Sequence, residues 1–129
     1  IKHSGKIDIL VCNAASNVHH GPSATIGDEA FAKIIDTNLK STHWLCHMVL
    51  PGMAARRDGA IVVISSIAGL RGSSHLGAYG ISKAGEIALA LPRKAWKTVR
   101  WREGSSGGLA SRFAAVRVRP SHRDYWRHG

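Results

Sequence analysis

The chain has 129 residues, of which 44% are hydrophobic and 20% charged, and its formal net charge is +10. This length suits one domain with a modest core, and the absence of a run of about 18 apolar residues excludes a membrane-spanning helix. Cys12 and Cys46 lie inside apolar runs and form no disulfide framework or zinc pattern, which fits a reducing compartment. No signal peptide is visible, so we expect a cytoplasmic protein that has no membrane partner. Because a strand-like run begins almost at once and no Met precedes it, we also expect an internal fragment of a longer protein.

The charge is concentrated near the C-terminus. Residues 1–90 hold 8 Lys and Arg against 6 Asp and Glu, whereas residues 91–129 hold 10 against 2. The second segment also contains three of the four tryptophans, and it has almost no helical or strand periodicity. A composition shift this sharp marks a boundary near Ala90. We therefore predict a boundary that separates residues 1–90 from a basic, Arg- and Trp-rich tail over 91–129 that is irregular.

The first half of residues 1–90 predicts a strand followed by a helix. Residues 6–12 form a short, continuous apolar run, which favours a strand buried on both faces, as in a parallel sheet. Thr25 opens a T-x-x-D helix-start pattern, and an apolar face follows at spacings of 3 and 4: Phe31, Ile34, Ile35 and Leu39. The apolar stretch 44–50 continues this helix. Pro51 kinks it, ends it, or lets it run on for a turn.

The second half repeats the pattern. Residues 60–65 predict a second buried strand, residues 66–77 a Gly- and Ser-rich loop, and residues 78–91 a helix that stops before Pro92. Strands separated by helices of this length imply right-handed parallel crossovers and a doubly wound α/β sheet. Ligands bind such sheets at the carboxyl ends of the strands, where this chain has small and polar residues.

Tyr79 and Lys83 are the most informative pair in the sequence. They lie four residues apart, so they share one face of the second helix. An ammonium near a phenol stabilises the phenolate, which makes Tyr79 a usable general acid/base. Ser66, after the preceding strand, can hydrogen-bond the same substrate oxygen. Taken alone, a Tyr and a Lys at this spacing are more often ordinary surface residues of a helix.

Four motifs follow one another in a definite order: Asn-Ala-Ala at 13–15, Asp-Thr-Asn at 36–38, Ile-Ser-Ser-Ile-Ala-Gly at 64–69 and Tyr-Gly-Ile-Ser-Lys-Ala at 79–84. Over roughly residues 5–90 this combination resembles the short-chain dehydrogenase/reductase family. The 13 residues from Ser66 to Tyr79 are a spacing typical of that family. Residues 5–17 most resemble its carbonyl-reductase-like branch, of the dehydrogenase/reductase member 4 type.

The resemblance implies an oxidoreductase that interconverts a small-molecule carbonyl and an alcohol, with NAD or NADP as cofactor. By the same resemblance Tyr79 is the acid/base, and Lys83 supports it and holds the nicotinamide ribose. Ser66 orients the substrate oxygen, and Asn38 holds a water of a proton relay through its backbone. The resemblance also places Tyr79 with Lys83 among the cofactor-binding residues, and Asn13, Ala14 and Ala15 line the adenosine side of the cofactor.

The chain departs from the family at both flanks. No Gly-rich pyrophosphate turn precedes Ile7, and the family's later strand, Pro-Gly turn and substrate lid are not legible after Leu91. We therefore expect a partial doubly wound parallel sheet, Rossmann-like, without the N-terminal cofactor-binding half or the C-terminal strand and lid. Such a chain is expected to be inactive alone, and a non-catalytic fragment or pseudogene product is an alternative. Full-length relatives are expected to be homo-oligomers that use the region of Trp44 and Met48.

Three interpretations of residues 91–129 remain open. The first is a shifted reading frame. Codons can be chosen for residues 96–101 that, read in a neighbouring frame, encode Glu-Asn-Gly-Pro-Val. In the family the corresponding helix often runs into Glu-Asn-Gly-Pro. The second is a genuine basic extension. The third is a nucleic-acid-binding segment whose tryptophans stack on bases, and we rank nucleic acid last among the partners.

The remaining candidates favour structural roles. His43 and His47 share a helix face, but no third ligand is spaced to complete a metal site, so we predict none. His19 and His20 fit loop polarity. Cys12 is expected to be a small core residue, because it lies at the end of a buried strand.

Overall fold

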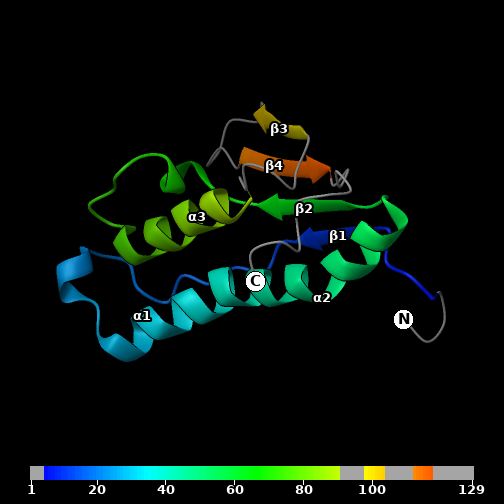
Figure 1. Ribbon diagram of the computed structural model, residues 1–129. Helices are drawn as coiled ribbons and strands as arrows, with labels where there is room; N and C mark the ends of the chain where they lie inside the picture. The colour runs from blue at the N-terminus through cyan, green and yellow to red at the C-terminus, as the bar shows by residue number, and fades with distance from the viewer. Residues whose placement is uncertain (1–4, 91–97, 104–111, 118–129) are drawn as a thin grey trace, which may run out of the picture.

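A computed structural model describes residues 5–90, 98–103 and 112–117 (Figure 1). The first strand, β1 (Ile9–Cys12), is followed by α1 (Asp28–Ile35), the π-helical turn η2 (Asp36–Lys40) and α2 (Ser41–Arg56). The second strand, β2 (Ala60–Ile64), is followed by α3 (Gly77–Leu89), and two 3-10 turns, η1 (Ser23–Thr25) and η3 (Ile67–Gly69), lie in the loops. β1 and β2 pair in parallel. The predicted order of strand, helix, strand and helix is thus confirmed.

The helical segment after β1 begins later than the T-x-x-D pattern at Thr25 suggests, and it continues beyond Pro51. Thr25 does not cap it, because its Oγ1 donates to the carbonyl of Pro22 (2.9 Å), and Gly27 is the N-cap residue. α2 runs through Pro51 and ends at Arg56, where Arg57 adopts the left-handed conformation with φ 55°. Of the three alternatives for Pro51, the structure therefore shows that the helix continues through this residue. No helix in the described part of the chain is long and apolar enough to cross a membrane.

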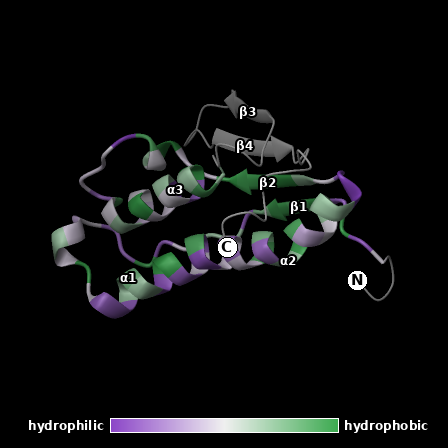
Figure 2. Ribbon diagram, in the orientation of Figure 1, coloured by the Kyte–Doolittle hydropathy of each residue, from purple (hydrophilic) through white to green (hydrophobic). Residues whose placement is uncertain are grey.

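The core lies on one face of the parallel pair. α2 packs there, and the core cluster consists of Cys12, Cys46, Met53, Ile61, Val63 and Ala90. Figure 2 shows both strands as hydrophobic along their length. On the opposite face of β1, however, Ile9 is 64% exposed and Val11 is 55% exposed. The prediction of a first strand buried on both faces is therefore wrong, because α2 covers only the face that bears Cys12.

The sheet also contains two strands from the C-terminal segment, β3 (Thr98–Glu103) and β4 (Arg112–Arg117), in the order β1-β2-β4-β3. β4 pairs antiparallel with both β2 and β3. This differs from the irregular segment that the sequence suggested. The physical reason is that the second edge of β2 carries backbone groups that need partners, and β4 supplies them. Most of residues 91–129 lies outside the described residues. Of the stretch 96–101 that raised the question of reading frame, residues 98–101 lie in β3, and Trp96 and Lys97 are outside the described residues.

Candidate active site

The predicted site segments meet at the carboxyl ends of the two parallel strands, beside α3 (Figure 1). Asn13, Ala14 and Ala15 follow β1 and are exposed. Ser65 follows β2, and its Oγ donates to the carbonyl of Lys83 on α3 (2.9 Å). The strand ends and the helix are therefore joined by direct hydrogen bonds.

Asn38 is fully buried in the π-helical turn η2 and ties three segments together. Its Oδ1 accepts from the backbone N–H of Ser16 (2.7 Å), and its Nδ2 donates to the Ser16 carbonyl (3.0 Å) and to Ser82 Oγ (2.9 Å). Its own carbonyl accepts a hydrogen bond from Thr42 Oγ1 (2.9 Å). The side chain of Asn38 thus fixes the loop after β1 against α3. The predicted water-holding role of its carbonyl stays a prediction.

We expect Asn38→Ala to lower the free energy of unfolding by about 2–3 kcal/mol, because it removes a fully buried side chain together with its three hydrogen bonds to Ser16 and Ser82. Urea denaturation followed by circular dichroism measures this loss. Asp36→Asn, on the same turn but exposed in a surface pair with Lys40, is the matched control and should change stability by less than about 0.5 kcal/mol. Equal losses in the two variants would contradict the linking role of Asn38.

Ser66 is held beside α3 by η3. It is the N-cap of that turn, and its Oγ accepts from the backbone N–H of Ala68 (3.2 Å). η3 approaches α3 closely because two glycines face the contact. A Cβ at Gly69 would lie 2.6 Å from the carbonyl carbon of Lys83, and one at Gly80 would lie 2.9 Å from the carbonyl oxygen of Ala68. The loop that bears Ser66 is therefore packed directly against the helix that bears Tyr79.

Tyr79 and Lys83 share a face of α3, as their spacing predicts, and the Lys83 Nζ lies 5.7 Å from the centre of the Tyr79 ring. Lys83 is only 2% exposed. Its ammonium donates to the carbonyl of Ile64 (3.0 Å) and to both carboxylate oxygens of Glu86 (3.0 and 2.9 Å). These three bonds use the three donors of the ammonium.

Glu86 is the residue of this site that sequence reasoning missed. It is 1% exposed, and burial raises the pKa of its carboxyl, while hydrogen bonds and the charge of Lys83 act in the opposite direction. Because both of its oxygens accept from Lys83, the bonding pattern is that of a carboxylate paired with an ammonium. Its i,i+3 spacing from Lys83 was the available signal, but such pairs usually lie on helix surfaces.

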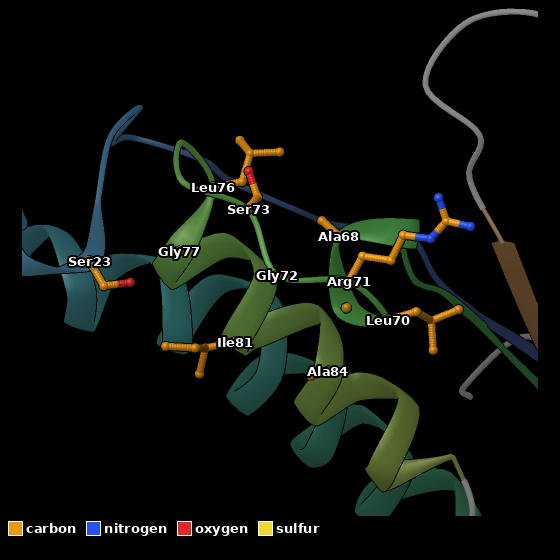
Figure 3. Close-up of a pocket in the computed structure, with 12 residues that line it drawn as sticks. Ser23, Ala68, Leu70, Arg71, Gly72, Ser73, Leu76, Gly77, Ile81 and Ala84 are labelled. Carbon is orange, nitrogen blue, oxygen red and sulfur yellow. The ribbon is translucent and has the colours of Figure 1, made fainter.

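A pocket of about 380 Å³ opens between the loop after β2 and the opposite face of α3 (Figure 3). Ser23 and Ile81 lie toward one end of it and Arg71 toward the other. Its lining includes neither Tyr79 nor Lys83. The pocket is therefore separate from the face on which the proposed chemistry is placed.

The other candidates lie away from this site. His43 and His47 are exposed on α2 with ring centres 6.4 Å apart, and the described residues contain no group of three or more side chains suited to a metal ion. Cys12 and Cys46 are free thiols buried in the core, so the expected core role of Cys12 is confirmed. A hydrogen bond with Cys12 and burial raise the pKa of Cys46.

Parallel strands joined by a helix, with small polar residues at their carboxyl ends, define an α/β protein with part of a Rossmann-like sheet. The chain belongs to the short-chain dehydrogenase/reductase family, since the family profile described as short chain dehydrogenase matches residues 1–94. It is 39% identical over 89 residues to the cattle (Bos taurus) dehydrogenase/reductase SDR family member 4, a match that covers 69% of this chain and 32% of that protein.

Solved structures give the same result. A short-chain dehydrogenase from Streptomyces avermitilis superposes with a TM-score of 0.66 at 26% identity, over 69% of this chain and 32% of the other. ElxO with NADP bound superposes with a TM-score of 0.65 at 36% identity, over 68% and 36%. The chain thus spans about a third of the length of these relatives.

Proposed function

We propose that the chain carries the acid/base and substrate-orienting part of an NAD(P)-dependent oxidoreductase that interconverts a carbonyl and an alcohol. The observation that supports this most is the placement of Tyr79 and Lys83 on one face of α3, next to the loop that holds Ser66. The family membership of residues 1–94 supports the reaction class. The substrate is proposed to be a small carbonyl compound or the corresponding alcohol.

In this proposal the Tyr79 hydroxyl gives its proton to the substrate oxygen during reduction and takes it back during oxidation. Ser66 donates a hydrogen bond to the same oxygen and orients it. Lys83 stabilises the phenolate of Tyr79, and to hold the ribose of the cofactor it exchanges one of its present hydrogen-bond partners, Ile64 or Glu86. When bound, the nicotinamide supplies or accepts the hydride.

The residues present fit the two ends of such a cofactor better than its pyrophosphate. Asn13, Ala14 and Ala15 are exposed after β1, and Tyr79 is partly buried, so both segments can be reached from solvent. In this sequence no Gly-rich turn that would bring backbone N–H groups to a pyrophosphate precedes β1. The donors of Lys83 are taken by Glu86 and Ile64. We therefore propose that Asn13, Ala14 and Ala15 line the adenosine side of the cofactor and that Tyr79 and Lys83 meet its nicotinamide side, with no cradle for the pyrophosphate identified between them.

A second candidate is a non-catalytic fragment, and the observation that favours it is that the chain spans a third of its relatives' length. If it is correct, the 129-residue chain should bind NADH and NADPH more weakly than a Kd of about 1 mM. Titration followed by cofactor fluorescence measures this, with a complete member of the family as the positive control. A Kd near the micromolar range would contradict the fragment interpretation and would support an active chain.

The exposed side of α2 supports a homo-oligomer. Trp44 is 55% exposed and Met48 is 67% exposed, one helical turn apart, with Leu45 beside them. A contiguous apolar patch of this kind on a helix suits a contact between identical subunits. We propose that this surface pairs two copies of the chain.

Met48→Glu should shift the chain toward monomer, because it places a charge in the centre of that contact. Sedimentation equilibrium with the unaltered chain alongside measures the change. Val18→Glu, which places the same charge at an exposed valine away from α2, is the control and should leave self-association unchanged. A Met48→Glu chain that associates as strongly as the parent would contradict this use of α2.

Two assignments stay predictions. A cytoplasmic location rests on the sequence alone, as does the low rank of nucleic acid among the partners. A test of nucleic-acid binding has to include salt, since affinity that disappears with rising salt reports only the charge of residues 91–129.

A further inference from the structure

Glu86 and Lys83 form a buried charge pair inside the proposed site. Their side chains are each 2% exposed, and the Lys83 Nζ lies 2.9 Å from the nearer carboxylate oxygen. A charged pair is costly to bury, so it persists only where the geometry and the remaining hydrogen bonds are good. Here the carbonyl of Ile64 completes the ammonium's set of acceptors at 3.0 Å.

We propose that Glu86 is a positioning residue for the acid/base site, holding the Lys83 ammonium against the end of β2 and balancing its charge where it faces Tyr79. The inference rests on the proposed role of Tyr79. In this arrangement the phenol of Tyr79 faces an ion pair in which the charge of Lys83 is balanced by that of Glu86. Release of the ammonium from Glu86 would then increase the positive field at Tyr79.

The geometry around the pair supports the proposal that Glu86 balances the charge of Lys83. The ammonium lies 5.7 Å from the centre of the Tyr79 ring, about twice its distance from the carboxylate. Groups on neighbouring segments also face the pair. Ser65, after β2, donates to the carbonyl of Lys83 and acts to lower the pKa of the Glu86 carboxyl, and the thiol of Cys12, on β1, lies close enough to interact with the charge of Glu86. Of these, only Glu86 carries a full negative charge near Lys83, so it controls how much of the cation reaches Tyr79.

The test is an ultraviolet titration of the phenol in the full chain. Tyr125→Phe leaves Tyr79 as the single tyrosine, because the sequence has two. In that background Glu86→Gln keeps the shape of the side chain and removes its charge. An unbalanced cation facing the Tyr79 ring favours the phenolate, so the midpoint of phenolate absorbance should fall by about one pH unit, a tenfold change in the ionisation constant.

Two further variants separate a charge effect from a structural one. Glu86→Asp keeps the charge and should titrate close to the parent. Lys83→Met/Glu86→Gln removes both charges and should abolish the shift. If Glu86→Gln leaves the midpoint unchanged or raises it, or if the double variant keeps the shift, the proposal is overturned.

A measurement on the unaltered chain covers the case in which Glu86→Gln does not fold. Lys83, held by Glu86, should react with acetic anhydride at least about tenfold more slowly than exposed Lys40, as read by peptide mass spectrometry. Equal rates would overturn the proposal. The proposed function is contradicted by a different result, namely turnover that persists when the Tyr79 hydroxyl is removed. Failure of one proposal can therefore be distinguished from failure of the other.

Discussion

Replacing Tyr79 by phenylalanine should reduce turnover by about 10²–10⁴-fold and leave cofactor affinity nearly unchanged, because it removes one hydroxyl that acts only on the reacting oxygen. Because the chain spans about a third of the length of its relatives, the assay uses a chimeric protein, called the graft. Residues 5–90 replace the matching segment of a complete family member, and initial rates of carbonyl reduction are compared with and without Tyr79→Phe.

Two controls make this result interpretable. The dissociation constant of the reduced cofactor, measured for the same variant, separates a lost proton donor from a collapsed site. Ser73→Ala, in the exposed loop, should keep full activity, whereas Ser66→Ala should lose part of it. A Tyr79→Phe graft that retains most of its kcat would show that the acid/base assignment is wrong.

Removing Glu86 alone should cost about 3–5 kcal/mol of unfolding free energy, because Lys83 would remain charged and buried without its partner. We expect Glu86→Leu to unfold at a much lower urea concentration than the parent. The double variant Lys83→Met/Glu86→Leu should recover most of the loss, since it replaces both charges by apolar side chains of similar size. Urea denaturation of the 129-residue chain, followed by circular dichroism, measures all three.

The exposed pair of Asp36 and Lys40, whose side chains are 58% and 49% exposed, is the matched comparison. Breaking it with Lys40→Gln should change stability by less than about 0.5 kcal/mol, because water already solvates both groups. If Glu86→Leu is no more costly than this surface change, or if the double variant is as unstable as the single one, the buried pair does not have the energetic role assigned to it.

The sequence predicts the parts of this molecule whose cause is local. Two continuous apolar runs predict the parallel strands, and the i,i+4 spacing of Tyr79 and Lys83 predicts that they share a face of α3. Exposure of Ile9 and Val11 was not predictable, because an apolar run does not reveal whether a second layer covers it. The order of motifs was sufficient to indicate the family.

The features that the sequence did not predict depend on contacts between segments far apart in the chain. β4 lies beside β2 through hydrogen bonds between segments about fifty residues apart, and no local pattern in the basic segment specifies that partner. Glu86 was missed because a carboxylate three residues from a lysine is usually solvated on a helix surface. Its burial follows from the packing of α3 against the end of β2, as the bond from Lys83 to the Ile64 carbonyl shows.

The most direct test of the central claim is the steady-state rate at which the graft of residues 5–90 reduces a carbonyl substrate with NADH or NADPH. The account predicts cofactor-dependent turnover, with the alcohol as product, because the segment supplies Ser66, Tyr79 and Lys83 to a complete cofactor site. A graft that folds and binds the cofactor but shows no turnover above that of its own Tyr79→Phe variant would contradict the claim.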